Sequence, residues 1–279
     1  SPGRPVFEFK TELPFFELFM IKTDKPEKLV HVLLDFGELL LESGAEVNRV
    51  EDTLNRIALA YGVKKVNIFV ITSEIVITVD FFDTNEVDLN SITETRRIFT
   101  GGTDFTTLER TNRLCRNVCR VLPAVDDVSN QLEEIRNAPQ QKKRWFFLGS
   151  ALASGSFAVF FGGSVWDGLV AALFGFLIAF QQLCMTKVCP NKVTFNIICS
   201  LITGLCIGLT AKVIPGLHSD KVMIGDIMLV IPGIAMTNSL RDIIMGDTVS
   251  GIIRLIESVL LAGALALGFM LSIYLMGLI

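Results

Sequence analysis

The chain has 279 residues, of which 51% are hydrophobic and 19% are charged, a more apolar composition than a soluble protein of this length needs. Residues 1–140 carry 16 basic and 23 acidic side chains, whereas residues 141–279 carry 9 basic and 6 acidic ones. This composition argues against a purely cytosolic enzyme. The acidic first half also excludes a nucleic-acid partner, which requires a clustered basic surface.

The first half, residues 1–140, predicts a cytoplasmic α+β domain. Asp24 and Glu27 form a typical helix start, and the apolar run 29–43 that follows them ends at Gly44. Five further elements are expected, in chain order: an amphipathic helix over 47–61, a β-hairpin over 66–79 that turns at 72–74, a third strand over 95–100, and helices over 104–121 and 126–137.

Charged residues of the first two helices form a band that we interpret as a solvated face. They are Glu38, Glu42, Glu46, Arg49, Glu51 and Asp52. His31 is the only histidine in this half, and no nucleophile elbow, P-loop or dinucleotide fingerprint is present. The six cysteines and two histidines of the chain form no zinc-binding pattern. We therefore expect no enzymatic activity, no metal and no cofactor.

The second half, residues 141–279, predicts a membrane domain of five helical spans. Three uncharged runs of 22, 19 and 19 residues lie between Arg144 and Asp167, between Asp167 and Lys187, and between Lys192 and Lys212. Each can cross a hydrocarbon core, which takes about 20 helical residues. A fourth span over 222–240 and a fifth over 251–279 follow. The expected fold class is a multi-pass α-helical membrane protein with an N-terminal cytoplasmic α+β domain.

The basic residues that flank the spans predict the orientation of the protein. With the N-terminal domain inside, the inside segments carry Lys142, Lys143, Arg144, Lys187, Lys192, Arg241 and Arg254, and the outside segments carry Lys212 and Lys221. We therefore expect a protein of the cell (inner) membrane whose N-terminal domain is cytoplasmic and whose C-terminus is outside.

Small residues recur at helical spacing in three of the spans. The sets are Gly204 and Gly208, then Ala171, Gly175 and Ala179, and finally Ser258, Ala262 and Ala266. Such faces let helices approach closely. We expect the spans to belong to a larger bundle, completed by self-association or by another membrane subunit.

The fourth span contains an expected break. Pro232 lacks an N–H and clashes with the preceding turn, and Gly233 permits an irregular backbone, so the helix is kinked or broken there. Discontinuous helices build the substrate sites of many transporters. A proline kink that only shapes helix packing is an equal alternative.

Ionisable residues near the break favour a translocation path, since such groups are costly inside a membrane. The expected path residues are Asp226, Pro232, Gly233, Asn238, Arg241, Asp242, Asp247, Arg254 and Glu257. Arg254 and Glu257 share a helical face, so a structural salt bridge between them is equally compatible with the pattern. Arg241 and Asp242, each taken alone, fit interfacial charges better.

A long ordered series of motifs runs through both halves. It comprises the segment 37–54, Phe161-Gly-Gly-Ser, Asp167, Pro232-Gly, Thr237-Asn-Ser-Leu-Arg-Asp242, Gly246-Asp247 and Ser250-Gly-Ile-Ile-Arg254. Over roughly residues 28–279 the chain thereby resembles the threonine/serine exporter family. The resemblance implies a cytoplasmic domain and membrane spans that export threonine and serine or, in some two-subunit systems, small dicarboxylates such as succinate, with energy from the proton gradient.

Single-chain members of that family carry a second membrane module, whereas this chain stops after the five expected spans. It therefore resembles the larger subunit of a split transporter, and the implied partner is a separate, smaller membrane subunit. Two modules with odd numbers of spans would lie in opposite orientations, as in an inverted repeat.

We expect the broken helix to offer backbone groups to a small-molecule substrate, Arg254 to meet its carboxylate, and Asp226 or Glu257 to carry a proton. The alternative hypothesis is a membrane-tethered metabolite sensor without transport activity of its own. A membrane-bound hydrolase is a third, which the missing catalytic constellation disfavours.

Overall fold

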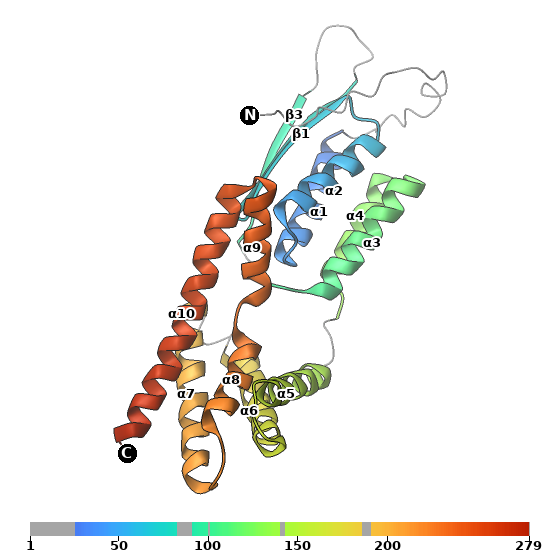
Figure 1. Ribbon diagram of the computed structural model, residues 1–279. Helices are drawn as coiled ribbons and strands as arrows, with labels where there is room; N and C mark the ends of the chain where they lie inside the picture. Colours follow the sequence, from blue (N-terminus) through green and yellow to red (C-terminus); the bar gives the residue numbers. More distant parts are fainter. Residues whose placement is uncertain (1–25, 83–90, 100, 140–142, 186–190, 279) are drawn as a thin grey trace. The chain divides into compact units, whose positions relative to one another are not determined.

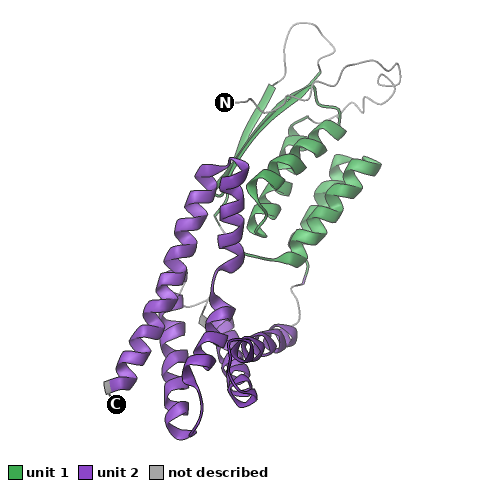
Figure 2. Ribbon diagram, in the orientation of Figure 1, with its two compact units in different colours: residues 1–138 green, residues 139–279 purple. Residues whose placement is uncertain are grey.

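The computed structural model describes residues 26–82, 91–99, 101–139, 143–185 and 191–278. The chain divides into two compact units, Ser1–Ala138 (unit 1) and Pro139–Ile279 (unit 2), which are coloured separately in Figure 2. The predicted domain boundary at residue 140 lies outside the described residues. The described part contains ten helices and three strands (Figure 1).

Two amphipathic helices, α1 (Pro26–Glu42) and α2 (Val47–Ala60), open unit 1 close to where the sequence predicts them. Asp24, from the expected start signal, lies outside the described residues. Gly44 follows α1 with a φ of 88°, a left-handed conformation that glycine adopts readily. A Cβ at Gly44 would also lie 2.7 Å from the carbonyl oxygen of Gly102, so the loop has no room for a side chain.

Three antiparallel strands form a sheet in the order β1-β2-β3. The predicted hairpin is present as β1 (Lys65–Ile71) and β2 (Glu74–Asp80), with Val70 opposite Ile75 and a two-residue turn between the strands. The third strand, β3, spans Ser91–Arg97, so the prediction of 95–100 is wrong by several residues. β3 lacks the apolar alternation that marks a half-buried strand.

β3 is held to α1 by ion pairs of its residue Arg96. Arg96 Nη1 donates to Asp35 Oδ1 at 2.6 Å and to Glu38 Oε2 at 2.8 Å, both on α1. Arg136 Nη2, on α4 (Val125–Arg136), donates to the same Glu38 oxygen at 2.7 Å. One carboxylate thus joins a strand and two helices. The interpretation of Glu38 as part of a solvated band is therefore wrong.

Glu51, which the sequence places in the same solvated band, is also not simply solvated. Its carboxylate accepts a hydrogen bond from the Val70 backbone N–H at 3.1 Å and so ties α2 to β1. Asp52, which pairs with Arg56 one turn along α2, is exposed as predicted.

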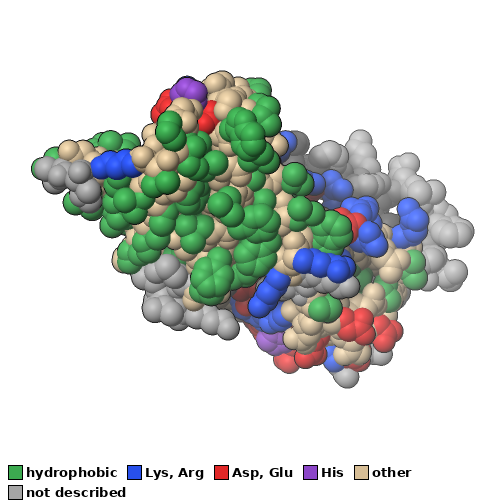
Figure 3. Space-filling model, turned by 90° about the horizontal axis from the view of Figure 1, so that it is seen from below, with side chains coloured by type: hydrophobic (Ala, Val, Ile, Leu, Met, Phe, Trp, Pro, Cys, Tyr) green, Lys and Arg blue, Asp and Glu red, His purple; other side chains and the backbone are tan. Residues whose placement is uncertain are grey.

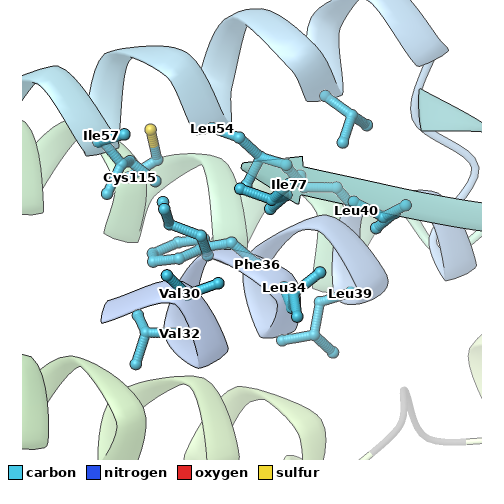
Figure 4. Packing of buried hydrophobic residues seen from close by; sticks show 14 of the residues in the cluster. Val30, Val32, Leu34, Phe36, Leu39, Leu40, Leu54, Ile57, Ile77 and Cys115 are labelled. Atoms are coloured by element: carbon cyan, nitrogen blue, oxygen red, sulfur yellow. The ribbon is translucent and has the colours of Figure 1, made fainter. Parts of the chain in front are cut away.

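α3 (Phe105–Val121) and α4 complete unit 1, within one residue of their predicted bounds. Asp104 caps α3, because its Oδ1 accepts hydrogen bonds from the N–H groups of Thr106 and Thr107 at 2.9 and 3.1 Å. Buried apolar side chains of α1, α2, β2 and α3 interlock around Phe36 (Figure 4). Their burial supplies most of the driving force for folding this unit.

Unit 2 is helical throughout its described residues. Its elements are α5 (Lys143–Phe160), α6 (Val165–Met185), α7 (Lys192–Val213), α8 (Ser219–Val230), α9 (Gly233–Met245) and α10 (Thr248–Leu278). Three of these, α6, α7 and α10, are long and apolar enough to cross a membrane, and α8 with α9 forms a fourth candidate as a bent pair. This supports a multi-pass helical membrane protein.

α5 is not among these candidate spans. It begins with Lys143 and Arg144, and two charges in a helix of 18 residues lower its mean hydropathy. The fifth crossing and the orientation of the protein therefore stay predictions.

Small residues let the helices of unit 2 pack closely. A Cβ at Gly208 would lie 2.8 Å from Met276 Cγ on α10, and one at Gly204 would collide with Ser272 of the same helix. Gly175 of α6 packs equally tightly against α5. The predicted small-residue faces on α6 and α7 therefore contact neighbouring helices, α5 and α10 respectively. On α10 the predicted face is wrong at Ala266, which is exposed, because Gly268 and Ser272 face α7 instead.

The outer faces of unit 2 are strongly apolar. Large exposed hydrophobic side chains include Leu169, Leu173, Phe176 and Phe180 on α6 and Val259, Leu260, Leu267, Met270 and Ile273 on α10. Figure 3 shows hydrophobic side chains over much of the face that is seen from below. An apolar outer surface of this extent is typical of helices that face lipid.

The carboxylate that joins three elements of unit 1 leads to a prediction about stability. Burial raises the pKa of Glu38, but the hydrogen bonds from Arg136 and Arg96 outweigh it and hold the pKa below its usual value. A lowered pKa means that Glu38 stabilises the fold above its unfolded pKa of about 4.3, and that this contribution is lost as the pH falls through the lower folded value.

Local unfolding of α1 and β3 exposes their backbone amides to hydrogen exchange. We therefore expect Glu38→Gln to lower the free energy of this local unfolding by about 1–2 kcal/mol at pH 7. Hydrogen exchange by mass spectrometry on the full chain measures this, and the difference from wild type should shrink below about pH 4. Asp52→Asn is the control and should change exchange little, because its ion pair is exposed. Identical exchange in Glu38→Gln and wild type at pH 7 would contradict the prediction.

Candidate functional site

The fourth apolar stretch is broken, as the sequence predicts. α8 ends at Val230, α9 begins at Gly233, and the pair is bent by 54°. Pro232 has a φ of −78° and a ψ of 54°, and the Gly233 N–H donates to the Ile231 carbonyl oxygen at 2.8 Å. These values describe an inverse γ-turn, which supplies a local hydrogen bond where proline interrupts the helix.

The lengths of the two half-helices place the break. At 1.5 Å per residue, α8 and α9 measure about 18 and about 20 Å, and each is shorter than a hydrocarbon core of about 30 Å. A crossing by this pair therefore puts the irregular backbone inside the membrane, where such backbone is tolerated only when protein or a water-filled cavity surrounds it.

Asp226 lies on α8 and is fully buried. Ser154 of α5 is hydrogen-bonded to its Oδ1, and the same Ser154 hydroxyl lies 2.9 Å from the carbonyl oxygen of Ala171 on α6. Gly225 makes this contact possible, because a Cβ there would lie 2.5 Å from the Ser154 carbonyl oxygen. Asp226 Oδ2 has no hydrogen-bond partner among the described residues.

Arg254 and Asp242 form a second buried group, between α9 and α10. Arg254 Nη1 donates to Asp242 Oδ2 at 3.1 Å, and the Asp242 side chain is 1% exposed. Glu257 is exposed, so the sequence-based alternative of a pair between Arg254 and Glu257 is wrong for the described structure. A charge as deeply buried as Asp242 needs a partner, which Arg254 supplies. The alternative that Asp242 is an interfacial charge stays a prediction.

The remaining expected path residues are less buried. Pro232, Asn238 and Asp247 are half-buried, whereas Gly233 and Arg241 are exposed. The structure brings together two of the nine expected residues as an ion pair, Asp242 and Arg254. Asp226 lies in a separate group, on the other side of the break along the chain.

A polar cluster that was not expected from the sequence lies between α6 and α7. Gln181 is 5% exposed, and its Oε1 accepts from Cys199 Sγ at 2.6 Å and from Thr203 Oγ1 at 3.3 Å. The Gln181 Nε2 amide has no hydrogen-bond partner among the described residues. An amide near the end of an otherwise apolar run was the available signal.

A fourth polar group lies at the N-terminal ends of α6 and α8. Asp167 is fully buried and accepts hydrogen bonds from the backbone N–H groups of Ser164 at 2.7 Å and His218 at 2.9 Å. The His218 ring Nδ1 lies 3.0 Å from the same carboxylate. Asp167 thus joins the loop before α6 to the loop before α8, a structural role that the sequence motif alone did not reveal.

Unit 1 offers little reactive chemistry among its described residues. Burial raises the pKa of the Cys115 thiol to about 12, so it stays protonated and is a poor nucleophile. His31 Nδ1 lies 3.2 Å from Glu94 Oε2, an ion pair across α1 and β3 when the ring is protonated. Over the described ranges of the whole chain, no three His, Cys, Asp or Glu side chains gather as a metal site.

Comparison with known proteins identifies similar sequences. A family model described as "Putative threonine/serine exporter" matches residues 31–276. A "Probable threonine/serine exporter" of Mycobacterium tuberculosis is 20% identical over 249 residues, which are 88% of this chain and 46% of the relative. A "Threonine/serine exporter" of Corynebacterium glutamicum is 22% identical over 248 residues, 86% of this chain and 49% of the relative. The chain thus spans about half the length of these relatives. No solved structure matches it.

The buried ion pair between α9 and α10 leads to a prediction about stability. Asp242→Asn or Arg254→Gln alone breaks this ion pair on one side and should lower the free energy of unfolding by about 3–5 kcal/mol. The double substitution removes both charges and should cost less than either single change. Thermal unfolding of the purified full chain measures the effect. Glu257→Gln, an exposed position on α10, is the control. Additive losses in the double variant would show that the pair does not stabilise the fold.

Proposed function

Because the chain belongs to the threonine/serine exporter family, we propose that it is a subunit of a secondary transporter that exports small carboxylate-bearing metabolites of the threonine and serine type. The observation that carries this proposal is the helix broken at Pro232, beside the fully buried Asp226. A static membrane anchor needs neither feature, and both are costly in lipid.

The broken span is the proposed centre of the translocation path. A half-helix that ends within the membrane leaves backbone groups without their helical partners, and discontinuous helices in transporters use such groups to bind substrate. The turn at Pro232 also lets α8 and α9 move as separate segments. Alternating access in transporters proceeds through movements of this kind.

The pair of Arg254 and Asp242 is the proposed gate on the cytoplasmic side. A substrate carboxylate has the same chemistry as the Asp242 side chain and can replace it on the guanidinium. Arg241, Asp247 and Glu257 would surround this entrance. The orientation follows from the distribution of basic residues, with the N-terminal domain in the cytoplasm.

Asp226 is the proposed proton carrier. The Ser154 hydroxyl has one hydrogen but lies within hydrogen-bond distance of two acceptors, Asp226 Oδ1 and the Ala171 carbonyl oxygen. A protonated Asp226 resolves this conflict, because it donates to Ser154 while Ser154 donates to Ala171. The packing around Ser154 therefore favours the neutral carboxylic acid at this position.

A separate, smaller membrane subunit, or self-association, is proposed to complete the transporter. The described helix α9 packs mainly against α10. Exposed apolar residues of α9, including Ile234, Leu240 and Ile244, would meet that partner or lipid. With α5 as a further crossing, unit 2 has five spans and the C-terminus lies outside.

We expect Asp226→Asn to abolish threonine and serine efflux while the protein still reaches the membrane, because the amide cannot exchange a proton. Efflux of labelled amino acids from preloaded cells measures this, with labelled succinate as a test of dicarboxylate cargo. Thr237→Ala, on the exposed face of α9, is the control. Wild-type efflux in Asp226→Asn would remove Asp226 from the mechanism.

We also expect the double variant Asp242→Asn and Arg254→Gln to recover stability relative to either single change but to export nothing. A purely structural pair would recover both properties. The measurement compares thermal unfolding of each variant with its efflux in the same membranes. Full efflux by the stable double variant would show that the pair is no gate.

A further inference from the structure

Buried polar atoms on α6 and α8 have no hydrogen-bond partner among the described residues, and they point to a ligand. They are Asp226 Oδ2 on α8 and Gln181 Nε2 on α6. Asp226 is fully buried and Gln181 is 5% exposed. An unsatisfied buried polar group destabilises a protein, and more so in a membrane interior, so two such groups on neighbouring helices require an explanation.

Cys199 and Thr203 of α7 complete the polar cluster around Gln181. Cys199 Sγ lies 2.6 Å from Gln181 Oε1 on α6, and α8, which carries Asp226, packs against both α6 and α7. Thr203, one turn further along α7, is fully buried, and its hydroxyl lies 3.3 Å from Gln181 Oε1. Three helices thus contribute polar side chains to one interior region that lipid does not reach.

The chemistry of the two free atoms is complementary. The Gln181 amide has an N–H to donate, which suits a carboxylate, and Asp226 Oδ2 accepts hydrogen bonds, which suits an ammonium group. We propose that Asp226 and Gln181 hold the two ends of an α-amino-acid zwitterion, with the Thr203 hydroxyl available to the side-chain hydroxyl of threonine or serine. This inference rests on the proposed function and names the residues that read the substrate.

The site is closed in this structure, because all of its side chains are buried. Opening requires α8 to move relative to α6 and α7, and the turn at Pro232 frees α8 from α9. The polar groups facing Asp226 are Ser154 on α5 and Cys199 on α7, and neither is charged at neutral pH. Ammonium binding would therefore displace the proton from Asp226, and each amino acid would leave in exchange for one incoming proton.

Three compounds distinguish the two ends of the site. L-Threonine has both charged groups, 1-amino-2-propanol lacks the carboxylate, and 3-hydroxybutyrate lacks the ammonium group. Isothermal titration calorimetry on the full chain in lipid nanodiscs measures the affinity for each. We expect wild type to bind threonine at least ~10-fold more tightly than either analogue, since a site built for a hydrogen-bonding group rejects ligands that lack it.

The two variants should lose different preferences. Asp226→Asn should reduce the preference for threonine over 3-hydroxybutyrate toward one and keep the preference over 1-amino-2-propanol. Gln181→Leu should do the reverse. A merely structural role would weaken binding of all three compounds by a similar factor. Ser272→Ala, a fully buried serine between α10 and α7, is the control and should keep both preferences.

The outcomes separate this proposal from the proposed function. If cells with wild-type chain export threonine but both variants keep the wild-type preferences, the two atoms face buried water only, and the site is wrong while the function stands. If wild type neither binds nor exports threonine, both proposals fail. Reciprocal loss of the two preferences supports the site.

Discussion

The missing N–H of Pro232 is the constraint on which the architecture of unit 2 depends. A backbone group without a partner is costly in lipid, so the chain forms a tight local turn and continues as a separate helix. The break gives α8 and α9 different neighbours. α8 packs with α5 and α6, whereas α9 packs with α10. The two buried carboxylates, Asp226 and Asp242, consequently lie in different surroundings.

Those surroundings give the two carboxylates different chemistry. Asp242 has a guanidinium within 3.1 Å, and so its charge is compensated where it lies. Asp226 has an uncharged hydroxyl as its hydrogen-bond partner, which does not neutralise the charge of a carboxylate anion. Both positions are possible only because small residues bring the helices close. Gly225 lets α8 approach the Ser154 backbone, and larger side chains would leave Asp226 without this contact.

Unit 1 uses charge in another way. Glu38 accepts hydrogen bonds from two arginines on different elements, so a carboxylate does part of the work that apolar packing does elsewhere in the unit. β3 is accordingly almost free of large apolar residues. This also explains why its position could not be predicted well, since the apolar alternation that locates β1 and β2 is absent from it.

The sequence by itself determined the helices, the β-hairpin, the run of apolar segments and the break at Pro232, because these follow from local periodicity and from the covalent structure of proline. It also indicated that Asp226 and Arg254 lie in an apolar region. Only the tertiary structure decided which partners these residues have. Arg254 pairs with Asp242 rather than with Glu257, and Asp226 contacts Ser154, 72 residues away in sequence. The physical reason is that contacts between helices depend on how closely and at what angle the helices cross. Those quantities are set by many small residues together, and no single motif contains them.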